Sequence, residues 1–176
     1  MSIKRVESKV KGSSNSKKSS STKGKLVIRA SNRKKGKRTR TIRKSAFRAV
    51  SNQFQTVLST RVPQVIYAQE EFDLENEYNP ATSTFTPEQN GVYSFTASVL
   101  FGSEPVTSVS VTLAVLVNND VKLSSLETLS SGRGIVLTTG IVRLRKGDAV
   151  TVVIQTSAEG FISTSTGTRF EGFRVR

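Results

Sequence analysis

Strict alternation of apolar and polar residues over residues 108–117 is the feature that most constrains the fold of this chain. Every odd position there is apolar, whereas the hydroxyl side chains of Ser108, Ser110 and Thr112 occupy even positions. Successive side chains of a β-strand point to opposite faces, so this spacing predicts a strand with one face in a core. Residues 92–101 repeat the pattern with aromatic residues, and we find no ten-residue window with a helical period. We therefore expect an all-β sandwich or jelly roll.

Short polar segments that contain Asn or Gly separate the predicted strands. Asn118-Asn119-Asp120 tolerate positive φ and predict a tight hairpin after the strand at residues 108–117. The sequence RKGD joins two further predicted strands, at residues 134–144 and 149–157. The first apolar element is expected at residues 45–50, and a last short strand closes the chain.

The positive charge of the chain is segregated into its first 44 residues. Up to Lys44 there are 17 Lys or Arg residues and one acid, so this segment carries +16, whereas the remaining residues have 10 and 12 and carry −2. Its first part is rich in Ser, Lys and Gly and cannot bury enough apolar surface to offset the entropy of ordering. We predict a flexible polycationic arm at residues 1–44 and one folded domain at residues 45–176.

A basic terminal tract of this kind points to an anionic polymer, most commonly nucleic acid. The arm has no aromatic residue for base stacking, so we expect non-specific contacts to backbone phosphates. A solubilising tail, a nuclear-import signal, or attachment to a cell-wall polymer or acidic lipid are the alternatives. The predicted nucleic-acid-binding residues are the cations of the denser half of the arm: Lys23, Lys25, Arg29, Arg33, Lys34, Lys35, Lys37, Arg38, Arg40, Arg43 and Lys44.

The chain contains neither His nor Cys, and this excludes several kinds of catalytic and metal site. Ser-His-Asp and Cys-His nucleophiles, His general bases, disulfides and ordinary zinc sites are excluded. We expect no enzymatic activity, no metal and no cofactor. The N-terminus lacks the apolar region of a secretory signal and no run approaches the roughly 20 apolar residues that cross a bilayer, so we expect a soluble, unprocessed protein without a membrane partner.

An acidic run comprises Glu70, Glu71, Asp73, Glu75 and Glu77. It could bind a cation or the basic arm of a neighbouring subunit, but no spacing typical of calcium ligands is present. A solvated loop without a ligand is the prediction.

Residues 72–101 carry motifs that resemble the globular domain of the complement q-subcomponent and tumour necrosis factor superfamily, of a bacterial or viral type. The match extends over residues 45–176, through a hairpin, a Gly-Asp turn and a terminal signature. The residues that carry the resemblance, in order, are Phe72-Asp73, Tyr78-Asn79, Phe85, Gly91-Val92-Tyr93, Phe95, Asn118-Asn119, Gly147-Asp148 and Phe170-x-Gly172-Phe173.

The resemblance implies a ten-stranded jelly roll that forms a compact homotrimer and acts by binding or assembly rather than catalysis. The aromatic residues of 92–101 are then core residues, or some of them line the threefold contact. Many members of the superfamily carry a collagen-like Gly-X-Y stem, whereas this chain has a polycationic arm in that place.

Two functions of different kinds fit a jelly roll with a basic arm. The leading hypothesis is a viral capsid protein in the virion, whose jelly roll builds the shell and whose arm binds the packaged nucleic acid. The alternative is a trimeric surface-display or decoration protein, on a bacterial spore, cell wall or phage head, that its arm tethers to an anionic matrix. A nucleic-acid-binding oligomer that encloses nothing is a third, weaker possibility.

Overall fold

Every regular element in the described part of the chain is a β-strand. The computed structural model describes residues 44–103, 105–106 and 108–175. The all-β prediction is confirmed. The strands are β1 (Ala46–Ser51), β2 (Gln55–Val57), β3 (Gln69–Asp73), β4 (Tyr78–Asn79), β5 (Thr84–Phe85), β6 (Gly91–Ser103), β7 (Val109–Val117), β8 (Asp120–Leu129), β9 (Arg133–Leu144), β10 (Val150–Thr156), β11 (Gly160–Ile162) and β12 (Ser165–Arg174).

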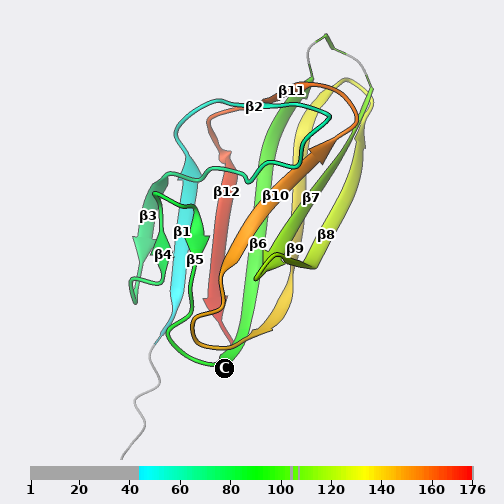
Figure 1. Ribbon diagram of the computed structural model, residues 1–176. Helices are drawn as coiled ribbons and strands as arrows, with labels where there is room; N and C mark the ends of the chain where they lie inside the picture. Colours follow the sequence, from blue (N-terminus) through cyan, green and yellow to red (C-terminus); the bar gives the residue numbers. More distant parts are fainter. Residues whose placement is uncertain (1–43, 104, 107, 176) are drawn as a thin grey trace, which may run out of the picture. The chain divides into compact units, whose positions relative to one another are not determined.

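The strands form two antiparallel sheets that pack face to face as a jelly roll (Figure 1). Sheet A has the order β2-β11-β6-β12-β1-β3, with β9 paired to the remaining side of β6, and sheet B has the order β4-β5-β10-β7-β8. Ten strands are predicted, and the structure has twelve within its described residues. Among the twelve, β2 pairs with β11, and β11 joins β6 at Phe101–Ser103, beyond the stretch that β12 covers.

The predicted strands and turns are confirmed to within a few residues. The alternating segment forms β7, and the two segments on either side of RKGD form β9 and β10. Asn118 and Asn119 have φ angles of 51° and 71°, as a two-residue hairpin requires, and Gly147 in the RKGD turn has a φ of 87°.

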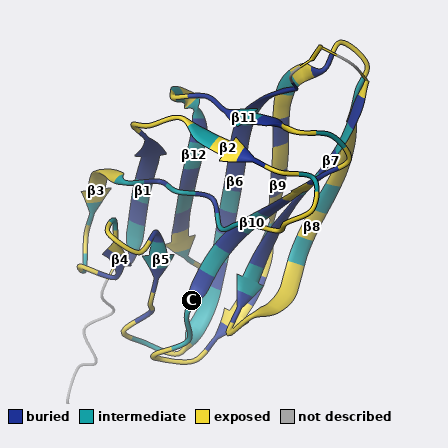
Figure 2. Cartoon of the chain, turned by 45° about the horizontal axis from the view of Figure 1, so that its top comes forward, coloured by how far each residue is buried: buried dark blue, intermediate teal, exposed yellow. Residues whose placement is uncertain are grey.

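Aromatic side chains from both sheets fill the core. Phe47 on β1 stacks on Tyr78 and Phe85 with ring centroids 5.0 and 4.7 Å apart, and Phe170 on β12 meets its ring edge-on at 5.0 Å. The aromatic residues of β6 at positions 93, 95 and 101 are completely buried within one protomer, and Figure 2 shows most of β6 in the colours of buried and intermediate residues. They are therefore core residues, and the alternative that they line a threefold contact is wrong.

Gly172 explains the glycine of the terminal signature. Its backbone passes directly over two core rings, so an added Cβ would lie 2.6 Å from Cδ1 of Phe95 and 3.0 Å from Cε1 of Phe47. Real Cβ atoms do not approach other atoms this closely. The position thus requires glycine because of packing rather than because of its φ angle.

The prediction of a solvated acidic loop at residues 70–77 is wrong in two respects. Glu70 and Glu71 belong to β3, the edge strand of sheet A, whose backbone pairs with β1 regardless of the charge on its exposed side chains. Glu77 is buried, and its Oε1 accepts a hydrogen bond of 2.7 Å from the backbone N–H of Glu88.

Neither a cluster of metal ligands nor a membrane-spanning helix is present in the described parts of residues 44–175. In the described parts of that range, no three acidic side chains gather closely enough to hold a metal ion. The same residues contain no helix with the length and apolar character needed to cross a membrane.

Candidate assembly surface

The face of sheet A that points away from the core carries five large apolar side chains that are 43–66% exposed. The strand register places them together, since directly paired residues of antiparallel strands share a face. Ile141 and Phe173 both pair with Ser94, and Phe72 pairs with Arg48. The even-numbered residues of β9 point into the core, which turns its odd-numbered residues outward. We call this set the apolar face: Phe72, Ile135, Leu137, Ile141 and Phe173.

Four charged side chains neutralise one another in the middle of the same face. Nε of Arg48 lies 2.9 Å from Oε2 of Glu71 and 3.6 Å from Oε2 of Glu171, although its N–H is not aligned for a hydrogen bond with either. Nε of Arg169 lies 3.4 Å from the other oxygen of Glu171. Two cations and two anions leave this cluster without net charge.

Three hydroxyl groups of the face are also satisfied within the sheet. Thr139 donates a hydrogen bond of 3.0 Å to the carbonyl of Phe95, and the hydroxyls of Thr96 and Thr139 lie 3.1 Å apart. Ser98 donates to the carbonyl of Gly167 at 2.7 Å. A second protein surface could therefore cover these groups without leaving their hydrogen-bonding capacity unmet, which is the usual condition for burying polar atoms.

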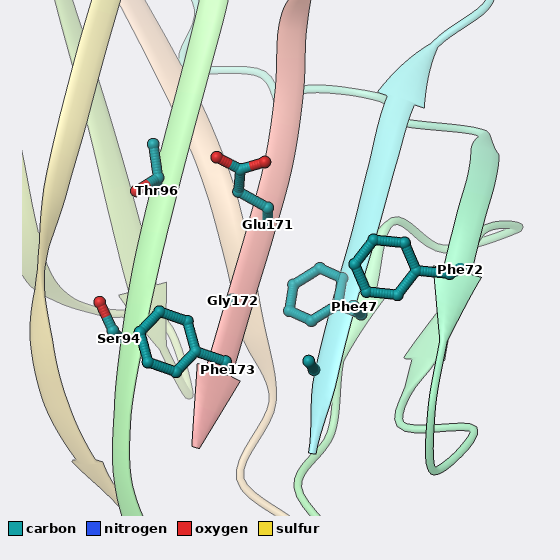
Figure 3. A pocket seen from close by; sticks show the side chains of 8 residues that line it. Phe47, Phe72, Ser94, Thr96, Glu171, Gly172 and Phe173 are labelled. Atoms are coloured by element: carbon teal, nitrogen blue, oxygen red, sulfur yellow. The ribbon is translucent and has the colours of Figure 1, made fainter. Parts of the chain in front are cut away.

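A shallow hollow of about 200 Å³ opens on this face between two aromatic side chains (Figure 3). Phe72 extends from β3 toward β1, whereas Phe173 lies at the end of β12 beside β6. The hollow is small for a drug-sized ligand but large enough to receive apolar side chains of another molecule. It is lined by Ala46, Phe47, Phe72, Ser94, Thr96, Glu171, Gly172 and Phe173.

Most of the predicted nucleic-acid-binding residues lie outside the described part of the chain. Lys44 is the first described residue and is exposed, two residues before β1. Their role stays a prediction, as does the boundary of the arm. The remaining ten are Lys23, Lys25, Arg29, Arg33, Lys34, Lys35, Lys37, Arg38, Arg40 and Arg43.

The apolar face was not predicted from the sequence, although β9 contains a signal for it. Val136 and Val142 at even positions are buried in the core, while Ile135, Leu137 and Ile141 occupy odd positions and are exposed. A strand that is apolar on both sides is typical of one that is covered on both sides.

Comparison with known proteins places the chain in a family. The sequence pattern of the C1q domain matches residues 46–175, so the chain belongs to the C1q domain family. The resemblance to the complement and tumour necrosis factor superfamily is thereby confirmed at this level. The bacterial or viral type and the basic arm remain predictions. No curated protein sequence matches the chain.

Solved structures support the same fold. The globular domain of zebrafish complement 1qA is 19% identical, with a TM-score of 0.55, over 76% of this chain and 98% of that one. Murine APRIL at pH 8.5 is 18% identical, with a TM-score of 0.56, over 74% of this chain and 97% of that one. Its structure at pH 5.0 has 16% identity and a TM-score of 0.55 over the same shares. C1q and TNF-like domains are generally structural or signalling proteins rather than enzymes.

Proposed function

We propose that this chain is a structural protein that associates into a homotrimer through the outer face of sheet A. The observation that carries the proposal is the combination on one face of exposed apolar side chains and an internally neutralised charge cluster. Contiguous exposed apolar patches mark interaction sites, and the cores of interfaces are poor in uncompensated charge. Homotrimers are typical of C1q and TNF-like domains.

The distribution of the apolar side chains suits a ring of three copies. A threefold contact joins two different patches of the same protomer, so each copy needs apolar surface at two places. Phe72 lies on β3, at one edge of sheet A, and Ile135 and Ile141 lie on β9, at the opposite edge. Each copy can thus offer one edge to each neighbour.

The arm then gives the assembly its partner. The arm carries a charge of +16, whereas the domain carries only −2. The domains therefore repel one another little, and their assembly brings many arms together. We propose that the trimers build a virion shell and that the arms bind the packaged nucleic acid through its phosphates. About 60 copies would neutralise roughly 1,000 phosphates, enough for a very small genome.

The alternative is a display or decoration trimer on a bacterial or phage surface. Membership of the C1q domain family favours it, since this places the chain among structural and signalling domains. The trimer contact would be the same, but the arm would hold an anionic matrix and the domain would be the exposed binding head.

Expression of the full chain separates these functions. The purified product would be examined by negative-stain microscopy, light scattering, and absorbance at 260 and 280 nm. The matched control replaces the eight Lys and Arg residues between Arg33 and Lys44 with Ser. A capsid protein gives closed particles that contain host nucleic acid, and the control gives trimers without it.

Two other outcomes of this experiment would reject the capsid function or the proposed assembly. Discrete trimers of the unaltered chain that are free of nucleic acid at physiological salt would reject the capsid and favour the display head. A monomer at micromolar concentration would reject assembly through sheet A altogether.

A further inference from the structure

The end of the domain at which the arm begins also carries two exposed arginines on β9 and the turn after it. Arg143 lies near the end of β9 and Arg145 lies just after it, and both residues are exposed and line the same hollow. Neither guanidinium forms a hydrogen bond or an ion pair with another described residue. By contrast, Lys146 in the same turn is paired with Glu88 at 2.5 Å.

A polar hollow lies beside these two arginines. Its volume of about 430 Å³ falls within the range of ligand sites, and its other lining residues are Asn90, Leu144 and Asp148. Asp148 is the one carboxylate in this lining. Its Oδ2 accepts the backbone N–H of Arg145 at 2.8 Å and its Oδ1 accepts the amide of Asn118 at 3.0 Å, which holds its pKa below the usual value. Both oxygens are thus engaged, one within the turn and the other by the hairpin between β7 and β8.

Backbone hydrogen bonds connect this site to the root of the arm. The N–H of Arg174 donates to the carbonyl of Ser45 at 3.0 Å, and that of Val175 donates to the carbonyl of Val92 at 2.7 Å. Val92 in turn pairs with Arg143. The strands β1, β12, β6 and β9 therefore meet at this end (Figure 1), and β1 lies three strand spacings from β9, about 14 Å.

Two exposed acidic residues of sheet A lie on the far side of this row, whereas Glu171 lies on β12 within the row and is paired with Arg48 and Arg169. Glu70 and Glu71 belong to β3, the edge strand beyond β1, whereas the two arginines are at the β9 edge. The β3 edge is consequently acidic, whereas the β9 edge combines the two arginines with Asp148 and with Glu88, which is paired with Lys146 of the same turn. The β9 edge is the one available to an anion.

We propose that Arg143 and Arg145 form a phosphate-binding site on the folded domain, which continues the nucleic-acid path that starts on the arm. This inference rests on the proposed role of the arm. Guanidinium groups bind phosphate oxygens in a bidentate manner. The distance of about 14 Å from the arm root corresponds to about four phosphates along one strand of nucleic acid. One strand can thus contact Lys44 and both arginines.

Salt dependence of binding tests the site on the full chain. The probe is a fluorescent single-stranded oligonucleotide, and its affinity is measured over a series of salt concentrations. Loss of two phosphate contacts in R143S/R145S should reduce the slope of log K against log salt by about 1.4 per chain that engages the strand. The R61S/R133S variant removes two exposed arginines elsewhere, one of them at the other end of β9, and should keep the slope. R143K/R145K keeps both charges and should restore it.

The outcomes separate this inference from the proposed function. Equal slopes for R143S/R145S and R61S/R133S, with binding lost on neutralising the arm, would overturn the site and leave the role of the arm intact. Absence of binding by the unaltered chain would overturn both. Light scattering on each variant excludes a change of oligomeric state as the cause.

Discussion

The outer faces of the two sheets differ although the sheets share one pattern toward the core. The outer face of sheet A combines five apolar side chains with a neutral charge cluster. On sheet B, six hydroxyl and amide side chains line the corresponding face, the exposed Leu126 pairs with Thr112, and the exposed Val121 pairs with the half-buried Leu116. The polar residues of that face are Ser110, Thr112, Ser124, Thr128, Thr151 and Gln155.

The difference separates what the fold needs from what assembly needs. Inward positions of both sheets are apolar because they form one shared core. Outward positions contribute little to that core. Their composition can therefore reflect whether the face contacts water or another copy of the chain. In the proposed trimer, sheet A is therefore the face that is covered and sheet B the face that is left in water.

The largest expected effect comes from a charge placed on the apolar face. I141D should dissociate the trimer, since an unpaired carboxylate buried in a contact costs about 3–5 kcal/mol, more than 100-fold in affinity. L126D makes the matched change on sheet B and should leave the trimer intact. Gel filtration with light scattering measures both. Dissociation by L126D alone would show that the sheets have the opposite roles.

A smaller effect is expected from the charge cluster, and it depends on whether the face is covered. R48A leaves Glu71 without its cation, while Glu171 keeps Arg169. In a covered face this should weaken the trimer by about 2–5 kcal/mol. If the face stays exposed to water, R48A should change the free energy of folding by about 1 kcal/mol or less, because salt bridges between partly exposed side chains contribute little. The side chains of Arg48 and Glu71 are about one-third exposed.

Dilution of R48A, followed by light scattering, distinguishes the two cases. The double variant R48A/E71A restores the balance of charge and should recover part of the lost affinity. Unchanged association of R48A would mean that the cluster stays in water.

The fold of the domain was predictable from the sequence because it depends on local patterns. Alternation in residues 108–117 identifies a strand irrespective of its neighbours, and Asn118-Asn119 identify the turn after it. The short strands β2 and β11 were not predictable in this way. β2 pairs with β11 and β11 pairs with β6, both across long sequence separations, and three residues carry too little periodicity.

The candidate surface was less predictable because it depends on register. Phe72 and Phe173 are 101 positions apart in the chain, and only the pairing of β3, β1 and β12 brings them to one face. Glu71 was likewise predicted in a solvated loop, whereas it lies beside Arg48 once β3 pairs with β1. The arm is the opposite case, since its charge is evident from composition alone.

The smallest effect, on stability rather than on assembly, tests whether inward and outward positions of sheet A have separate roles. Gly172 is an inward position, where a methyl group would collide with the rings of Phe95 and Phe47. G172A should destabilise the domain by about 1–3 kcal/mol, as is usual for overpacking in a core. Below its unfolding transition the variant should still form the trimer, because the added methyl group points away from the apolar face.

Urea denaturation followed by fluorescence, with light scattering on the native sample, measures the stability and the association of G172A separately. The control S124A changes an outward position of sheet B and should alter stability by no more than about 0.5 kcal/mol. If G172A folds with full stability but fails to associate, the division between inward and outward positions is wrong for β12, and the contact must depend on the backbone of that strand.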